Sequence, residues 1–213
     1  MDGAKGEYAI DHLMAWRWGN LCYYLTIPAL LWFALGNWMI NDVYRALWAV
    51  MAALIAALPA IVEWRTRWIF PWPAKFLVGL ALFLHIGGGM MSWYFDYFPV
   101  YDKIAHLVSS MAFALLVFLY LLYLASSSRV RLGRRTIILL VVSVTLFFGC
   151  LWELAEFLLD VNLLSTYFVT PWDSLFDTIF NILGTGYIAF HANEYLKLEP
   201  PEKVFARFVK RSL

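Results

Sequence analysis

The sequence predicts an all-α membrane protein with six transmembrane helices and with both the N and C termini in the cytoplasm. Of its 213 residues, 63% are hydrophobic and only 15% are charged, whereas a soluble domain is about 45–50% apolar and about 25% charged. Six apolar stretches approach the roughly 20 residues that a helix needs to cross a bilayer. They are residues 21–40, 44–62, 76–95, 104–125, 136–159 and 174–196. We therefore expect a multi-pass protein of a prokaryotic plasma (inner) membrane, in contact with the lipid bilayer.

Lysine and arginine set the expected orientation. Of the 16 lysines and arginines, all but Arg45 and Lys103 fall in the N-terminal arm, the second and fourth loops or the C-terminal tail. Because loops rich in these residues stay in the cytoplasm, we expect these four regions there. The first, third and fifth loops, the last of them residues 160–172, should then lie outside.

The chain should divide into three parts. Residues 1–20 place Trp16 and Trp18 among charged residues and should form an arm in the membrane interface. Residues 21–196 should form the six-helix bundle, with Pro28 kinking or opening the first helix. Residues 197–213 carry a basic amphipathic pattern typical of binding to anionic headgroups, and a solvated tail is the alternative. The sequence contains no nucleic-acid-binding motif.

Ionisable residues recur at helical spacing near the outer ends of the last three expected helices. On a helix, spacings of three and four put side chains on one face. A charged residue at the membrane centre costs about 2.5–3.5 kcal/mol on insertion scales, so each needs a function or a partner. We expect one shared site because the three helices deliver these residues to a similar depth. The residues are Asp102 and His106, Glu153 and Glu156, and Asp173, Asp177 and Asn181.

This composition favours a metal site. Clustered carboxylates in apolar surroundings take up protons or bind a cation. A histidine beside them suits zinc, manganese or iron better than calcium or magnesium. Glu153 is the candidate catalytic residue, as general base for a metal-activated water. The candidate metal ligands are Asp102, His106, Glu156, Asp173 and Asp177.

Simpler interpretations of these residues stay open. Asp102 and Asp173 could be helix N-caps, and His106 could be a hydrogen-bonded core histidine. Glu153 and Glu156 lie at a helix C-terminal end, where the macrodipole disfavours anions, so they would need partners such as Lys103 or polar groups across the bundle.

Two further polar positions favour packing. His85 is followed by three glycines; it could be a deeper ligand or a relay, but a packing role between closely approaching helices is the simpler interpretation. Asn181, with a glycine-containing stretch after it, fits a helix-packing face.

Three short motifs resemble a known family. They read YDKIAH at residues 101–106, WELAEF at 152–157 and WDSLFD at 172–177, with Gly184 downstream. In this order they resemble the YjdF-like family of small inner-membrane proteins and, more distantly, the VanZ-like proteins linked to glycopeptide resistance. The resemblance covers residues 95–190. It implies the positions of the motifs on the helices and brings no assigned activity with it.

The predicted function is a membrane-embedded, outward-facing metal site, hydrolytic towards a lipid-linked or envelope substrate. Two other classes stay open. The same carboxylates could carry protons or cations in a transporter. Alternatively, the 11 tryptophans and 17 phenylalanines could anchor an accessory structural subunit to partner subunits in a larger membrane complex.

Overall fold

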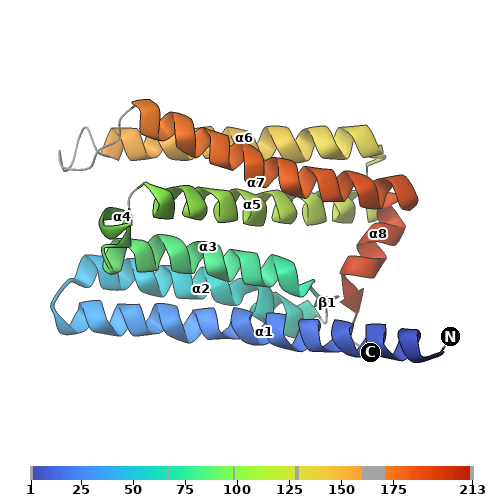
Figure 1. Cartoon of the computed structure of the whole chain (residues 1–213), viewed down its shortest axis with the longest axis horizontal. Helices are drawn as coiled ribbons and strands as arrows, with labels where there is room; N and C mark the ends of the chain where they lie inside the picture. The colour runs from blue at the N-terminus through green and yellow to red at the C-terminus, as the bar shows by residue number, and fades with distance from the viewer. Residues whose placement is uncertain (1, 67, 98, 128–129, 160–170, 212–213) are drawn as a thin grey trace. The chain divides into compact units, whose positions relative to one another are not determined.

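The computed structural model describes residues 2–66, 68–97, 99–127, 130–159 and 171–211 (Figure 1). The chain forms two compact units. Unit 1 comprises residues 1–92 together with 210–213, and unit 2 comprises residues 93–209.

Unit 1 is built from three long helices and one short strand pair. The helices are α1 (Asp2–Met39), α2 (Val43–Thr66) and α3 (Trp72–Met90). α1 packs against both other helices, and α2 also contacts α3. Strand β1 (Trp68–Ile69) pairs antiparallel with β2 (Lys210–Arg211), so that Trp68 lies opposite Arg211. This pair ties the C-terminal end of the chain to unit 1.

Small residues let the helices of unit 1 approach closely. Three alanines of α2, Ala52, Ala53 and Ala56, are buried against Leu30 of α1. Alanine side chains leave room for a neighbouring backbone, as at many membrane helix interfaces. Gly79 of α3 faces Thr26 of α1, where an added Cβ would lie 3.2 Å from the Thr26 Cβ.

A tyrosine hydroxyl of α1 forms hydrogen bonds with two backbone groups of α2 beside the proline of that helix. Pro59 lies inside α2, where proline lacks an N–H and opens the helix. The Tyr23 hydroxyl of α1 donates to the Ala56 carbonyl oxygen at 2.8 Å and accepts from the Ala60 N–H at 3.3 Å. Freed backbone groups in apolar surroundings require such partners, so Tyr23 holds α1 against the opened turn.

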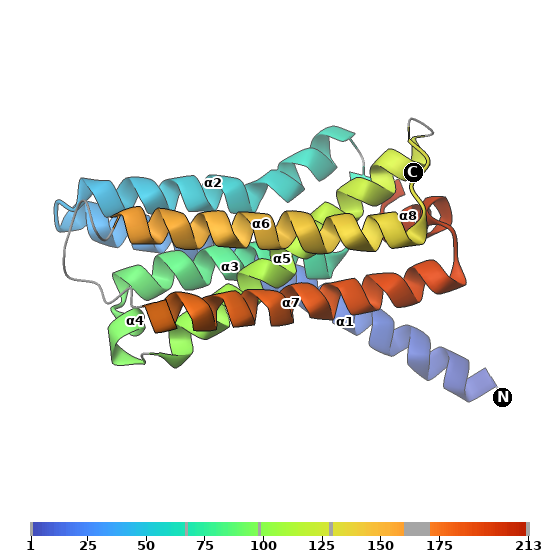
Figure 2. The same ribbon diagram turned by 90° about the horizontal axis from the view of Figure 1, so that it is seen from above.

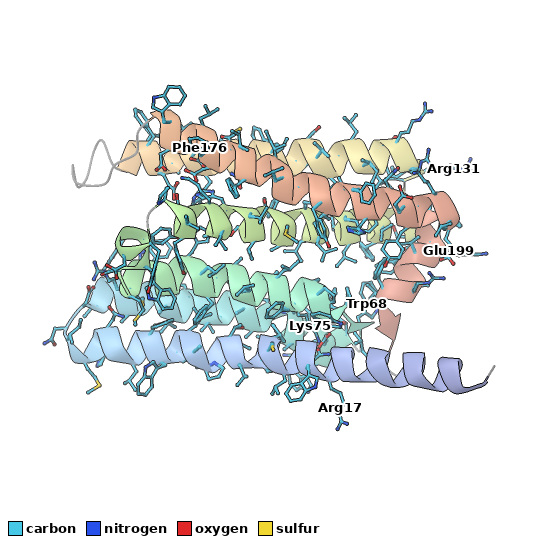
Figure 3. All side chains as sticks on the ribbon, in the orientation of Figure 1. Arg17, Trp68, Lys75, Arg131, Phe176 and Glu199 are labelled. Atoms are coloured by element: carbon cyan, nitrogen blue, oxygen red, sulfur yellow. The ribbon has the colours of Figure 1, made fainter. Side chains whose placement is uncertain are left out.

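An ion pair between the buried Lys75 and the partly buried Glu63 lies at one end of unit 1. The Lys75 ammonium lies 2.9 and 3.1 Å from the two carboxylate oxygens of Glu63. Glu63 also accepts the Phe70 N–H at 2.7 Å, and Lys75 lies over the Tyr23 ring. Figure 3 shows Lys75 at the end of unit 1 near Trp68. The pair fixes the segment between α2 and α3.

Unit 2 contains the predicted site. Its helices are α4 (Trp93–Asp96), α5 (Val100–Ser126), α6 (Arg134–Leu159), α7 (Pro171–Leu198) and α8 (Pro201–Phe208). α7 packs against both α5 and α6, which also contact each other (Figure 2). Gly184 permits the close approach of α7 to α5, because an added Cβ would lie 2.5 Å from the Leu107 carbonyl oxygen and would also collide with Ser110.

Five of the six expected spans are supported by length and composition. Among the described residues, the helices apolar and long enough to cross a membrane are α2, α3, α5, Arg17–Met39 of α1 and Arg134–Leu158 of α6. α7 is long enough at 28 residues, but it carries Asp177, Asn181 and His191 and is not among the five. Its role as the sixth span stays a prediction.

Several predicted boundaries differ from the observed helices. The residues expected to form an arm continue into the first span as one helix, and α1 runs through Pro28. The third helix ends at Met90, not at residue 95, and a separate short helix α4 follows. The predicted outer loop 160–172 falls almost wholly outside the described residues.

The basic helix α8 turns its apolar face towards its own unit. Val204 is buried, Phe205 packs on Tyr123 of α5, and Phe208 packs on Tyr195 of α7. These side chains therefore contact protein. Binding of the basic side chains to lipid headgroups, with a solvated tail as the alternative, stays a prediction. Arg207 remains exposed and pairs with Glu199, which Figure 3 places where α7 gives way to α8.

Candidate metal centre

The three helices α5, α6 and α7 bring the predicted polar residues together in unit 2. α5 contributes Asp102 and His106, one helical turn apart. α6 contributes Glu153 near its C-terminal end, and α7 contributes Asp177 and Asn181, again one turn apart. His106, Glu153 and Asp177 are buried, with exposed fractions of 3%, 8% and 2%. The helical spacings in the sequence therefore do place these groups on facing surfaces.

Lys103 forms the centre of one half of the cluster. Its ammonium lies 3.1 Å from Asp102 Oδ2, 2.5 Å from Asp173 Oδ1 and 2.7 Å from Asp177 Oδ1. Lys103 itself is buried. A buried ammonium needs compensating charge and hydrogen bonds, and the three carboxylates supply both. The lysine thus joins the first turn of α5 to the first two turns of α7.

His106 lies between this half and a second one. Its Nε2 is 3.5 Å from Asp102 Oδ1 and 3.7 Å from Asp177 Oδ1. Its Nδ1 is 3.4 Å from Glu153 Oε1 and 3.5 Å from Asn181 Nδ2. The two ring nitrogens therefore face different carboxylates, those of aspartates on one side and that of a glutamate on the other.

Within the part of the chain that the structure describes, two sets of side chains could hold a metal ion, and both include His106. Asp102, His106 and Asp177 form one set, and His106, Glu153 and Glu156 form the other. Within each set, one ligand atom per residue lies within 4.8 Å of the others. Carboxylate oxygens and an imidazole nitrogen suit a borderline divalent metal.

The charge balance of the cluster favours a bound cation. Five carboxylates gather around one lysine and one histidine, counting only side chains in the described part of the chain. Taking charges out of water costs several kcal/mol per ion unless each is compensated. Moreover, Glu153 Oε1 is buried and accepts no hydrogen bond from any described residue. The glutamate half therefore lacks the compensation that Lys103 gives the aspartate half.

The structure shows whether the aspartates are helix caps and which carboxylates pair with Lys103. α5 has Pro99 at its N-cap, so Asp102 lies inside the first turn. Asp173 likewise lies inside the first turn of α7, which begins at Pro171. Anions are favoured there by the helix dipole, but neither residue is a cap. Lys103 forms its ion pairs with aspartates. The simpler interpretation of Glu153 and Glu156 had instead offered Lys103 as their partner.

Sequence reasoning gave two of these residues only part of their observed role. Lys103 was counted as a loop charge and as a possible partner of the glutamates, whereas its ammonium pairs with three aspartates. Asn181 was placed in the shared cluster and also given a packing role, and the structure puts its amide nitrogen 3.5 Å from His106 Nδ1. His85 lies on α3 of unit 1, and its role stays a prediction.

Tyr94, on the short helix α4, also lies beside this cluster. On α4 it packs edge-on against Tyr101, with ring centroids 5.1 Å apart. Burial raises the pKa of the Tyr94 hydroxyl, and the nearby carboxylates of Asp102, Glu156 and Asp177 raise it further. The hydroxyl therefore stays protonated, and a protonated hydroxyl can donate a hydrogen bond to a carboxylate.

Comparison with known proteins gives a family and no named relative. A family model described as "Predicted membrane protein (DUF2238)" matches residues 21–197. The matched region covers α2, α3, α5 and α6, residues 21–39 of α1, all but the last residue of α7, and every candidate site residue. No curated protein and no solved structure matches the chain.

Proposed function

The chain belongs to the DUF2238 family of predicted membrane proteins, and we propose that its buried carboxylate–histidine cluster binds one divalent metal around His106 and uses it for hydrolysis. The substrate class is a lipid-linked or envelope molecule, since two of the three helices that hold the cluster, α5 and α6, are long and apolar enough to cross a membrane. The observation that carries the proposal is the imidazole of His106 between two sets of carboxylates, with a buried oxygen of Glu153 that accepts no hydrogen bond from the described residues.

A bound zinc, manganese or iron ion would supply a water of lowered pKa as the nucleophile. Which carboxylate takes up the proton of this water depends on the side of His106 on which the ion binds. An ion at His106 Nε2 leaves Glu153 available as the predicted base, and Asp102 and Asp177 are then ligands. An ion at Nδ1 makes Glu153 a ligand.

The orientation and location of the protein belong to the same proposal. The positive-inside rule places both termini in the cytoplasm, α7 as the sixth span, and the cluster in the outer half of a prokaryotic plasma membrane. Figure 3 shows Arg131 at the end of unit 2 opposite to Phe176. Phe176 is one residue from Asp177, so this arginine-bearing end lies away from the cluster, as the orientation requires. The motif resemblance to YjdF-like proteins is consistent with the same membrane.

Metal-dependent turnover tests this function. Purified protein in lipid vesicles is incubated with a panel of lipid esters and lipid-linked phosphates, before and after treatment with a chelator. We expect product release that the chelator abolishes and added zinc or manganese restores. His106→Ala should abolish it as well, whereas His191→Ala, on an exposed histidine of α7, should not. Turnover that survives both the chelator and His106→Ala would refute the proposal.

A second candidate function, movement of protons or cations, is favoured by one observation. Thr145 and Thr185 are buried, and neither hydroxyl has a hydrogen-bond partner among the described residues. Gly149 faces Asn181 across α6 and α7, and the two threonines lie one turn further along these antiparallel helices. They extend the polar surface of the cluster deeper between the helices, where ions or water would pass.

Flux measurements separate the two functions. In vesicles with a pH or cation gradient, transport predicts a flux that Glu153→Gln abolishes and Thr185→Val reduces. Hydrolysis predicts no flux above that of protein-free vesicles. A flux insensitive to both substitutions would count against transport through this cluster.

A further inference from the structure

The two sets of ligands around His106 are not equivalent. Both contain two carboxylates and one ring nitrogen. They differ in whether a lysine ammonium lies beside the carboxylates. This difference indicates on which side of the imidazole a metal binds.

The aspartate side already holds a cation. Asp177 Oδ1, the oxygen that lies 3.7 Å from His106 Nε2, is also the oxygen that lies 2.7 Å from the Lys103 ammonium. An ion bound to that oxygen at the usual distance of about 2.0–2.2 Å would lie within about 5 Å of the ammonium. Two like charges so close in a buried site repel each other strongly. Lys103 and a metal therefore compete for this side.

The glutamate side has no such competitor. Among the described residues, no lysine or arginine forms an ion pair with Glu153 or Glu156. Glu153 is more than nine-tenths buried, and its Oε1 lies 3.4 Å from His106 Nδ1 without accepting a hydrogen bond from the described side chains. Two glutamates also carry the charge that one divalent ion neutralises.

The spacing on this side fits a coordination shell. Ligand atoms of a tetrahedral ion with bonds of about 2.1 Å lie about 3.4 Å apart, which is the observed separation of Nδ1 and Glu153 Oε1. Asn181 adds a fourth group, because its amide nitrogen lies 3.5 Å from the same ring nitrogen. Rotation of the amide would present its oxygen instead.

We propose that the metal of the proposed function binds at His106 Nδ1 with Glu153, Glu156 and the Asn181 amide oxygen, and that Lys103 holds the aspartates on the other side. His106 Nε2 then carries its hydrogen towards Asp102 and Asp177. Carboxylates behind a metal-bound histidine orient the ring and raise its basicity. In this arrangement Lys103 and the aspartates are positioning residues, and Glu153 changes from the predicted base to a ligand.

Paired variants test this assignment through metal affinity. Zinc affinity is measured in detergent by competition with a chromophoric chelator, after circular dichroism has shown that each variant is folded. Glu156→Gln removes a ligand on the glutamate side. The double variant Lys103→Met with Asp177→Asn removes the shared ammonium and one of its three carboxylate partners on the aspartate side. Glu194→Gln, on an exposed glutamate of α7, is the matched control.

We expect Glu156→Gln to weaken zinc binding by more than about 100-fold and the double variant to weaken it by about 10–100-fold or less, as changes behind the ligands do. Glu194→Gln should leave the affinity unchanged. An equal or larger loss in the double variant would overturn the assignment while leaving the metal site itself in place. A wild-type chain with no zinc affinity would instead refute the proposed function on which the assignment rests.

Discussion

The Lys103 ammonium on α5 lies 2.7 Å from Asp177 Oδ1 on α7, and both side chains are buried. This contact joins two of the three helices that build the cluster. It also explains how three aspartates can lie so close together near the ends of apolar helices. The same lysine neutralises part of their charge and receives their hydrogen bonds.

Replacing Lys103 should therefore destabilise unit 2. In Lys103→Met, the carboxylates of Asp102, Asp173 and Asp177 lose their shared cation, and breaking a buried ion pair from one side costs about 3–5 kcal/mol. Lys197→Met is the matched control, because Lys197 and Glu194 form an exposed pair of a kind that contributes about 0–1 kcal/mol. The free energy of unfolding in mixed micelles measures both. Equal losses in the two variants would show that Lys103 is not the central counter-ion.

Gly184 should be needed for the approach of α7 to α5. In Gly184→Ala, the new methyl group would meet the Leu107 carbonyl and Ser110, so α7 must move away from α5. We expect a loss of about 1–3 kcal/mol in unfolding free energy, as for overpacked cores. The measurement is unfolding in mixed micelles, with metal content determined in parallel.

Gly186 provides the control for this substitution, because an added Cβ there meets nothing within 4 Å. Gly186→Ala should be neutral or stabilising by up to about 1 kcal/mol, since alanine favours the helix. If both alanine variants behaved alike, the close contact at Gly184 would not hold the site together.

How far the sequence predicted the site can be seen from these same residues. The helical spacings correctly predicted that Asp102 and His106 share a face, as do Asp177 and Asn181. Spacing does not fix which faces of two helices meet. Between α7 and α5 the close approach depends on Gly184, where only hydrogen leaves room for the neighbouring helix, and between α6 and α7 Gly149 lies against the Asn181 amide. The direction of the Lys103 side chain follows from the contact of α7 with α5 and so could not be predicted from its own helix.

The helices of the fold could be predicted from the sequence, but the way they pack against one another could not. Composition and the length of the apolar stretches predicted long membrane-crossing helices, and five meet that expectation among the described residues. The division into two units depends on which helices pack together, and hydropathy carries no information about this. The partners of the apolar face of α8 could not be predicted because an amphipathic helix buries its apolar side equally well against lipid or against protein.

Removal of the Tyr23 hydroxyl should weaken unit 1. In Tyr23→Phe, the Ala56 carbonyl and the Ala60 N–H beside Pro59 lose the group that bridges them. Leaving buried backbone groups unsatisfied costs about 1–3 kcal/mol. Tyr24→Phe is the matched control because its ring is half exposed. Thermal unfolding in detergent should show a lower midpoint for Tyr23→Phe alone, and an unchanged midpoint would contradict the bridging role.

The orientation can be tested with single cysteines. Cys22 and Cys150, both exposed on their helices, are first replaced by alanine. We expect Tyr97→Cys, next to the cluster end of α5, to react with a membrane-impermeant maleimide from outside intact cells. Val130→Cys, between α5 and α6, should react only after the membrane is permeabilised. The reverse pattern would place the cluster on the cytoplasmic side and exclude an outer-leaflet substrate.

The most direct test of the metal centre is the metal content of the purified wild-type chain. Protein prepared in mild detergent without chelator should retain about one divalent metal ion per chain by elemental analysis, because ligand sets of this kind bind metal as part of the folded state. His106→Ala should contain none and still be helical, since the backbone hydrogen bonds of membrane helices lie within each helix. A folded wild-type protein that holds no metal under these conditions would contradict the account and leave a metal-free network of ion pairs in its place.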